Sequence, residues 1–358
     1  QQTQSWTALD GKLGSDAASL AIVVVDIRNV GGVPHYHYYS NGSFNRLGQN
    51  WSSTKVLAEV AALHRIRLES GGRIGTDAII NDVGLGRRTF LEHTYRLHDT
   101  SDNASGGLFK HLAGIAPVDS GRPNATAFVR GWISRPADTF NGYYAYSSFD
   151  SYYLLRSNAS SATVRLETPS DGRTSNLVTP LVMAEMWKRL GVNFRDPSLL
   201  PQGRGEGAGA ETYAYRGPRG ADDNAYRPAS TAGWKPTLTE GDLLGLFWGS
   251  ADPDSDAITG MVHDLGIRSR YTAALGGSSQ LDGWTRGAWR IYAKTGWGSD
   301  NSALGGYMCL PKFKGGRELA FFVLGSAPDG TGRVRRALER MVDIFAPGLR
   351  NEAPKPDP

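Results

Sequence analysis

The sequence predicts an α/β protein of the α+β kind, with a five-stranded antiparallel sheet flanked by helices in one lobe and an all-helical second lobe. Strand-like patterns occur only near the two ends of the chain, and the long middle has mostly helical periodicity. Pairing of the end strands would build the sheet lobe from both ends, and a cleft between two lobes is a common ligand site. The predicted boundaries are residues 1–50 and 285–348 for the sheet lobe, 51–284 for the helical lobe and 349–358 for a disordered tail.

The strands are predicted from apolar runs that are bounded by turn residues. The run LAIVVVDIR at residues 20–28 is typical of a buried strand, and the Gly31-Gly32 turn after it favours a hairpin partner over residues 33–40. Near the end of the chain, Gly315-Gly316 marks a turn between two further strands. The three strands predicted there cover residues 288–296, 303–310 and 318–325.

The main helix is predicted to begin at Ser52, because Val56, Val60, Leu63 and Ile66 recur at helical spacing. Other helical patterns cover residues 89–97, 108–113, 180–190, 240–248, 257–265 and 332–345. Two segments without clear periodicity, near residues 114–160 and 199–236, are interpreted as insertions that either rim the ligand site or decorate the surface. The tyrosines of the first insertion favour packing over the site; they are Tyr143, Tyr144, Tyr146, Tyr152 and Tyr153.

Composition and charge exclude several classes of function. The net charge is +4 over 358 residues and the basic residues are scattered, which argues against nucleic-acid binding. No apolar run approaches the roughly 18 residues that cross a bilayer. Cys309 is the single cysteine and the histidines lack ligand spacing, so we expect no disulfide, no metal and no cofactor. The chain begins with Gln1 and not with Met, from which we expect a removed signal peptide and a secreted or periplasmic protein.

Three short motifs carry the chemistry, and they occur in a fixed order. The first is S-x-x-K at Ser52–Lys55, the second is Ser-Asp-Asn at Ser101–Asn103, and the third is Lys-Thr-Gly at Lys294–Gly296. Each motif alone is weak, because the first also describes a helix start, the second a turn and the third a strand end. Together and in order they are specific.

The three motifs resemble those of the serine β-lactamase and penicillin-binding-protein superfamily, and the pattern is closest to class A β-lactamases. Thr179-Pro180, at the start of a predicted helix, is similar to the Thr-Pro that follows the omega loop in class A enzymes. One departure is the distance from Ser101 to Lys294, which is far wider than in class A enzymes and agrees with the proposed insertions. The resemblance implies a serine hydrolase that forms an acyl-enzyme on Ser52.

The residue types agree with this implied chemistry. A serine hydroxyl is a weak nucleophile and needs a base, and Lys55 lies one helical turn after Ser52 on the same face. A second cation, Lys294, and partial burial would both help Lys55 to lose its proton. Ser101 can pass a proton to the leaving group, and Asn103 can hold Lys55 or a substrate amide.

Substrate binding is assigned to the third motif. Lys294 and Thr295 can grip a substrate carboxylate at a strand edge, where Gly296 leads on to Trp297. The backbone N–H of Ser52 and that of Trp297 are expected to form an oxyanion hole. The expected partner is a small β-lactam, or an acyl-peptide or ester, and the protein is expected to be a monomer.

The base for deacylation is the open point of the sequence. By resemblance to class A enzymes, Glu167 in Arg165-Leu166-Glu167 is the candidate, but the following Thr168-Pro169-Ser170-Asp171 departs from the family pattern. A second hypothesis treats Glu167 as a surface carboxylate, which favours a D-Ala-D-Ala peptidase, an esterase or an amidase or acyl-transferase over a β-lactamase. A third hypothesis is a non-catalytic binder of cell-wall peptide, against which the intact Ser52 and Lys55 argue.

Overall fold

The computed structural model describes residues 4–30, 33–115, 139–140, 142, 144, 149–168, 176–195, 290–309 and 318–345. The helices expected at 240–248 and 257–265, the insertion at 199–236 and the tail at 349–358 lie outside the described residues, as does most of the insertion at 114–160. The chain divides into two compact units. The first takes in Gln1–Ser53, Thr179–Gly191 and Ala251–Pro358, and the second takes in Thr54–Val178 and Val192–Ser250.

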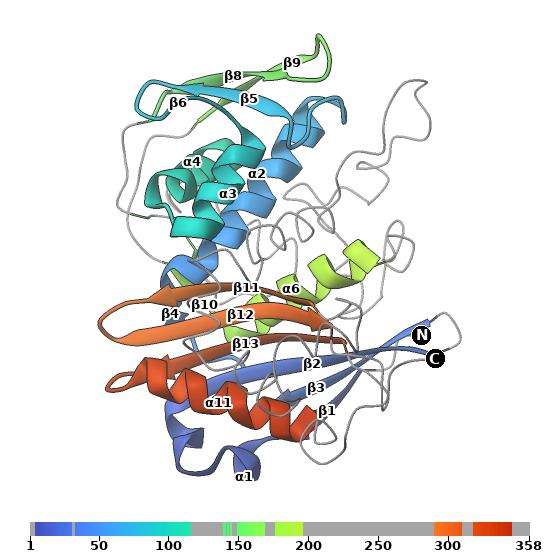
Figure 1. Cartoon of the computed structure of the whole chain (residues 1–358), viewed down its shortest axis with the longest axis vertical. Helices are drawn as coiled ribbons and strands as arrows, with labels where there is room; N and C mark the ends of the chain where they lie inside the picture. The colour runs from blue at the N-terminus through green and yellow to red at the C-terminus, as the bar shows by residue number, and fades with distance from the viewer. Residues whose placement is uncertain are drawn as a thin grey trace, which may run out of the picture. The chain divides into compact units, whose positions relative to one another are not determined.

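The first unit is built on the predicted antiparallel sheet, and all five predicted strands are present in it (Figure 1). The strand order is β1-β3-β2-β13-β12-β11, so the two ends of the chain meet where β2 pairs with β13. β2 lies in the interior of the sheet, and residues 21–25 have no exposed surface, which explains their continuous apolar run. The strands are β1 (Gln4–Ala8), β2 (Leu20–Val30), β3 (Val33–Ser40), β11 (Arg290–Trp297), β12 (Asn301–Cys309) and β13 (Glu318–Ser326).

A sixth strand, β1, was not predicted from the sequence; it pairs in parallel with β3 at the edge of the sheet. Its sequence, QSWTA, has few apolar residues, as an edge strand allows, and it therefore lacks the apolar run from which the other strands were predicted.

Helices cover both faces of this sheet. The indole of Trp187 in α6 (Pro180–Arg195) lies against Gly305, while Gly325 lies against Gly330 of α11 (Gly330–Phe345). Gly325 pairs in register with Ser302. Because side chains alternate along a strand, residues 302 and 305 of β12 face opposite sides, and so do the two helices. A short helix α1 (Asp10–Leu13), a 3-10 turn (Gly14–Ser19) and a two-residue strand β4 (Gly48–Gln49) complete the described part of this unit.

The second unit is organised around α2 (Lys55–Glu69), which is buried on nearly all sides and packs closely along α4 (Asn103–Ala113). Between them in sequence, α3 (Phe90–Thr100) begins at a capping box in which Thr89 and Glu92 bond each other's backbone N–H. None of the described helices is long and apolar enough to span a membrane.

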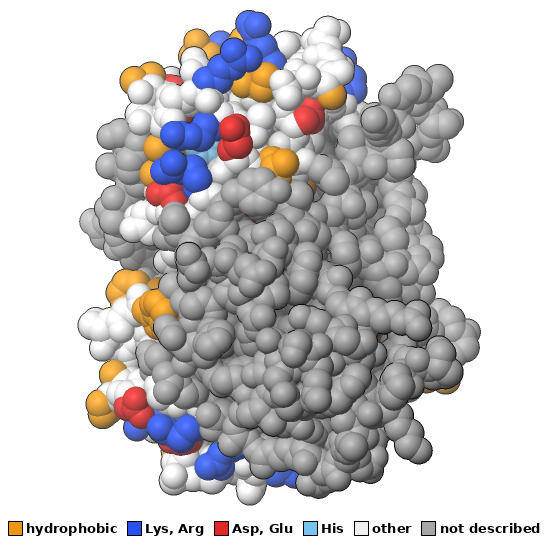
Figure 2. Space-filling model, in the orientation of Figure 1, with side chains coloured by type: hydrophobic (Ala, Val, Ile, Leu, Met, Phe, Trp, Pro, Cys, Tyr) orange, Lys and Arg blue, Asp and Glu red, His pale blue; other side chains and the backbone are white. Residues whose placement is uncertain are grey.

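The expectation of an all-helical second lobe needs correction, because the second unit also contains a four-stranded sheet of order β6-β5-β8-β9. β8 (Tyr152–Ser157) alternates buried and exposed positions, but its outward residues include Tyr152 and Leu154, which hide the alternation in the sequence. Figure 2 shows basic side chains around this sheet on the face in view. Arg156 and Arg165 are among the exposed residues of the sheet. Its other strands are β5 (Ala78–Asp82), β6 (Gly86–Thr89) and β9 (Thr163–Glu167), and a separate pair joins β7 (Thr139–Phe140) and β10 (Asn176–Val178).

Candidate active site

Ser52 lies in a 3-10 turn, Trp51–Thr54, that runs directly into α2. The turn is closed by Ser53, whose backbone N–H and hydroxyl donate to the carbonyl of Asn50 at 3.2 and 2.6 Å. Trp51 adopts a left-handed conformation, with φ of 50°, just before the candidate nucleophile. Ser52 is half-buried at the start of the helical segment, as the S-x-x-K motif predicts.

The end of β11 lies against this turn at backbone distance. A Cβ atom added to Gly296 would lie 2.2 Å from the carbonyl oxygen of Asn50, 2.7 Å from the nitrogen of Ser53 and 3.0 Å from that of Ser52. These are main-chain atoms, which cannot turn aside as a side chain can. The glycine of the Lys-Thr-Gly motif therefore lets the edge strand approach the nucleophile's turn.

The predicted oxyanion donors lie close together in this arrangement. The N–H of Gly298 donates to the carbonyl of Asn301 across the hairpin, at 3.0 Å. Because N–H directions alternate along a strand, the N–H of Trp297 points the other way, toward the edge of β11 that pairs with no described strand. The neighbouring Gly296 is the residue that meets the nitrogen of Ser52. Both predicted donors therefore lie at the same edge of the first unit.

Lys294 and Thr295 are buried in the same strand, with 1% and 4% of their surfaces exposed. The ammonium of Lys294 donates to the carbonyl of Thr295 at 3.1 Å. Residues two positions apart on a strand point to the same face of the sheet. Lys294 therefore points to the face of β11 on which Gly296 meets the Ser52 turn. The first unit thus holds a buried cation on the same side of the sheet as the candidate nucleophile.

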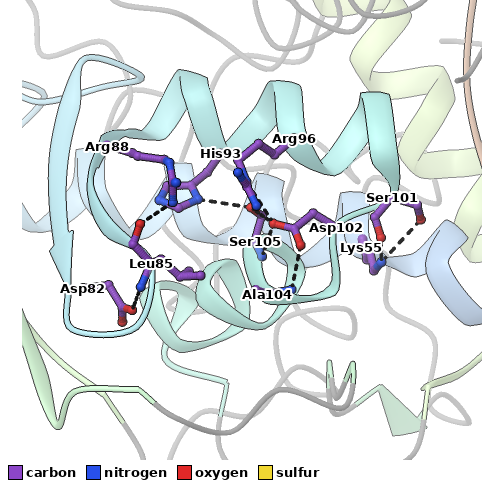
Figure 3. A network of polar contacts seen from close by, with 10 residues as sticks. All are labelled: Lys55, Asp82, Leu85, Arg88, His93, Arg96, Ser101, Asp102, Ala104 and Ser105. Carbon is purple, nitrogen blue, oxygen red and sulfur yellow. Dashed lines mark hydrogen bonds and ion pairs between the residues drawn. The ribbon is translucent and has the colours of Figure 1, made fainter. Parts of the chain in front are cut away.

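Lys55 is fully buried in the second unit, and its ammonium is held by the Ser-Asp-Asn motif (Figure 3). The Nζ atom donates to the backbone carbonyl of Ser101 at 2.5 Å and to Oδ1 of Asn103 at 2.7 Å, and it lies 3.4 Å from Oγ of Ser101. Gly106 of α4 packs against the aliphatic stem of Lys55, where an added Cβ would approach three of its carbons at 3.1 Å. The structure therefore brings together the lysine of the first motif and both polar residues of the second.

Burial lowers the pKa of Lys55 from 10.5 to about 8, although the negative charge of Asp102 acts to raise it. The neutral fraction of Lys55 at pH 7 is then about a tenth, whereas at the ordinary pKa it would be less than about one part in a thousand. Lys55 is therefore tuned toward the range in which a lysine can accept a proton from a hydroxyl.

Asp102 fixes the turn that holds Lys55. Its carboxylate caps α4 by accepting from the backbone N–H groups of Ala104 and Ser105, at 3.3 and 3.2 Å, and it pairs with Arg96 at 3.2 Å. Ser101 before it is left-handed, with φ of 54°, which turns the chain between α3 and α4. The sequence analysis read this triplet as a motif, and the capping role of its aspartate explains how the motif keeps its shape.

Tyr144 is a site residue that sequence reasoning identified only as one member of a tyrosine-rich segment. Its hydroxyl lies 3.0 Å from Oγ1 of Thr54, and its ring centre lies 5.4 Å from Nζ of Lys55. Burial raises the pKa of Tyr144, so its hydroxyl stays neutral. Tyr152 and Tyr153 lie on β8, and Tyr143 and Tyr146 lie outside the described residues.

Glu167 does not join the Lys55 cluster. Its carboxylate is 60% exposed and pairs with the neighbouring Arg165 at 2.7 Å. Its backbone carbonyl accepts from Arg65 at 2.8 Å. Arg65 lies ten residues beyond Lys55 on α2, about 15 Å along the helix axis. A role of Glu167 in deacylation thus stays a prediction, and its surroundings are those of a surface carboxylate.

The candidate site residues fall into two sets, each within one unit. Ser52 and residues 294–297 belong to the first unit, and Lys55, Ser101 and Asn103 belong to the second. The chain passes from one unit to the other between Ser53 and Thr54, inside the S-x-x-K motif itself. Among the described residues, no cluster of histidine, cysteine or acidic side chains is suited to a metal ion.

Comparison with known proteins gives no match to a family model and no match among curated proteins. Solved structures do match over almost the whole chain. The structure of PBP-A aligns with a TM-score of 0.50 at 11% identity, covering 96% of this chain and 99% of that one. A β-lactamase from Xanthomonas campestris gives 0.45 at 16% identity, covering 95% and 99%, and one from Sphaerobacter thermophilus gives 0.47 at 15% identity, covering 93% and 95%.

At 11% identity, the match to PBP-A concerns the fold alone. The antiparallel strands β2, β3, β11, β12 and β13, with helices on both faces, are the five that the apolar runs of the sequence predicted. The chain has the serine β-lactamase and transpeptidase fold.

Proposed function

We propose that this protein is a serine hydrolase that forms an acyl-enzyme on Ser52, and that its substrate is a β-lactam amide. The observation that carries the proposal is the state of Lys55. Its ammonium is buried, its pKa is lowered to about 8, and it is held by Ser101 and Asn103. A lysine in this condition, one turn after a half-buried serine, has the properties of a general base for that serine.

The proposed acylation step follows from these positions. Neutral Lys55 accepts the proton of the Ser52 hydroxyl while the serine oxygen attacks the carbonyl carbon of the substrate. The N–H groups of Ser52 and Trp297 stabilise the negative oxygen that forms. The C–N bond then breaks, an ester to Ser52 remains, and the nitrogen takes up a proton through Ser101. Hydrolysis of the ester by water releases the acid and restores the serine.

Substrate binding is assigned to the edge of β11. Lys294 supplies a cation and Thr295 a hydroxyl, which together suit a carboxylate. Support for this assignment is their burial in the strand that reaches the Ser52 turn through Gly296.

One observation favours a second candidate function within the same fold. The carboxylate of Glu167 is exposed and pairs with Arg165. Its backbone carbonyl accepts from Arg65, which lies far along α2 from Lys55. Without a carboxylate to activate water, the acyl-enzyme that a β-lactam forms on Ser52 would be long-lived. The activity would then resemble that of a D-Ala-D-Ala peptidase, an esterase, an amidase or an acyl-transferase.

Labelling with a fluorescent penicillin, followed by a chase with unlabelled drug, tests the proposal. A β-lactamase gains label on Ser52 and loses it within seconds to minutes, whereas the second candidate gains label that persists. A fluorophosphonate probe, which needs only an activated serine, provides the parallel test for an esterase. Absence of both labels from folded protein, or undiminished labelling of the Ser52→Ala variant, would contradict the proposal.

A further inference from the structure

A chain of hydrogen bonds that begins at a buried histidine lies behind the turn that holds Lys55 (Figure 3). His93 of α3 is completely buried, and its Nδ1 atom lies 3.1 Å from the hydroxyl of Ser105 in α4. That hydroxyl donates in turn to Oδ2 of Asp102 at 2.6 Å. None of the roles proposed above for acylation uses His93 or Ser105.

The order of donors in this chain defines the protonation of His93. Burial raises the pKa of Asp102, but hydrogen bonds from Ser105 and Arg96 outweigh it and keep the carboxylate ionised, so that it only accepts. Ser105 has one hydroxyl hydrogen, which goes to Asp102, and its oxygen must therefore accept from His93. The imidazole carries its hydrogen on Nδ1. Its Nε2 atom is buried and has no hydrogen-bond partner among the described residues.

The charged groups around His93 keep it neutral. Burial lowers the pKa of His93 to about 4, and the positive charges of Arg88 and Arg96 act in the same direction. The negative charges of Asp102 and Asp82 act to raise it. The groups come from β6, α3, the start of α4 and the end of β5. A neutral histidine with a fixed hydrogen on Nδ1 is a constant donor to Ser105 at every pH at which the protein would work.

The end of this chain is placed between the two residues that hold the catalytic lysine. Asp102 is flanked by Ser101 and Asn103, whose oxygens both accept from the Lys55 ammonium. A shift of the Asp102 backbone would therefore displace both acceptors together. The chain His93–Ser105–Asp102 fixes the aspartate from the side opposite to the lysine, through bonds that run between α3 and α4.

We propose that His93 is a positioning residue, which acts through Ser105 and Asp102 to hold the Ser101–Asn103 turn against the Lys55 ammonium. The consequence for catalysis rests on the proposed function, whereas the consequence for Lys55 itself does not. Loss of the histidine's donor frees the Ser105 hydroxyl to rotate, weakens its bond to Asp102 and loosens the turn. Water then reaches Lys55.

Two variants of His93 test this proposal. His93→Asn keeps an N–H donor near the position of Nδ1, and His93→Leu removes the donor at similar volume. The pKa of Lys55 is measured by following its 13Cε resonance in lysine-labelled protein, with the resonance assigned from the Lys55→Met variant. We expect His93→Leu to raise this pKa from about 8 to about 8.5 or higher, as water enters, and His93→Asn to keep it near the parent value.

Acylation by penicillin provides the second measurement. We expect the acylation rate of His93→Leu to fall about tenfold, and that of His93→Asn to stay within about threefold of the parent. If His93→Leu does not fold, Ser105→Ala interrupts the same chain by removing one oxygen, and the same rise in the pKa of Lys55 is expected.

The outcomes separate the two proposals. A Lys55 pKa that is unchanged in both His93→Leu and Ser105→Ala would overturn the positioning role, even if both variants melt at lower temperature. An equal rise in His93→Asn and His93→Leu would also overturn it, because the donor would then be irrelevant. A parent protein that fails to acylate, while its Lys55 responds as expected, would overturn the proposed function and leave the positioning role supported.

Discussion

The two sets of site residues are held in place by different means. Around Ser52, the backbone of β11 meets the backbone of the nucleophile's turn, and the contact depends on Gly296 having no side chain. Around Lys55, side-chain and main-chain oxygens converge on one ammonium, and a buried chain of polar groups supports them. The first arrangement has no room for an added atom, whereas in the second the positions of the polar groups depend on hydrogen bonds. The variants below test this difference, from the largest expected effect to the smallest.

Gly296→Ala should have the largest effect. The new Cβ would overlap the carbonyl oxygen of Asn50 and the nitrogen of Ser53, at 2.2 and 2.7 Å. We expect a loss of roughly 3 kcal/mol in the free energy of unfolding, and labelling of Ser52 below detection. Gly11→Ala is the matched control, because an added Cβ there meets nothing within 4 Å. Parent-like labelling of Gly296→Ala would show that the strand and the turn are not in contact.

Lys55→Met should leave the fold intact and remove the base. We expect acylation to slow by about a hundredfold to ten-thousandfold. The pKa of Lys55 in the folded protein, about 8, lies below its ordinary 10.5, so the folded state binds this proton more weakly than the unfolded chain does. Charged Lys55 therefore destabilises the fold below about pH 8, and this cost fades as the pH rises from about 8 to 10.5. Thermal melting at pH 7 should show Lys55→Met at least as stable as the parent, and a large loss of stability would contradict this account.

Lys294→Ala separates binding from proton transfer. We expect acylation by substrates that carry a carboxylate to fall about tenfold to a hundredfold further than acylation by neutral esters, since a buried cation is lost. The comparison is made from kcat/KM or from acylation rates on matched anionic and neutral substrates. An equal loss with both kinds of substrate would remove Lys294 from carboxylate binding.

Glu167→Gln should have the smallest effect. Its ion pair with Arg165 joins two exposed side chains, and such pairs contribute about 0 to 1 kcal/mol. We expect turnover within about twofold of the parent, and no more acyl-enzyme in intact-protein mass spectra than the parent accumulates. A stable acyl mass on Ser52, appearing at an undiminished acylation rate, would instead identify Glu167 as the deacylating base and favour the β-lactamase function.

The sequence predicted the features that depend on strong local patterns. The apolar run at residues 20–25 is the sheet interior, and three short motifs were enough to propose Ser52, Ser101 and Lys294 as site residues. β1 and β8 were missed, because an edge strand needs few apolar residues and the outward face of β8 carries Tyr152 and Leu154.

Contacts between distant segments were also beyond a single sequence. Tyr144 reaches Lys55 from 89 positions away, and His93 acts on Asp102 through a serine that no motif marks. The contact of Gly296 with the Ser52 turn is of the same kind. Its glycine was visible in the sequence, but the close backbone approach that requires a glycine there appears only once the two segments are brought together by the sheet.

The central claim is that Lys55 is the base for Ser52, and the dependence of the acylation rate on pH tests it most directly. Only the neutral lysine accepts a proton, so the second-order rate constant of acylation, which reports the free enzyme, should rise with pH and level off, with its midpoint at about 8. The measurement is a stopped-flow series from pH 5.5 to about 10 on the parent and on Lys55→Met. A midpoint near 8 that disappears in Lys55→Met is the predicted result. A rate that is flat across this range, or a midpoint that persists without the lysine, would contradict the account.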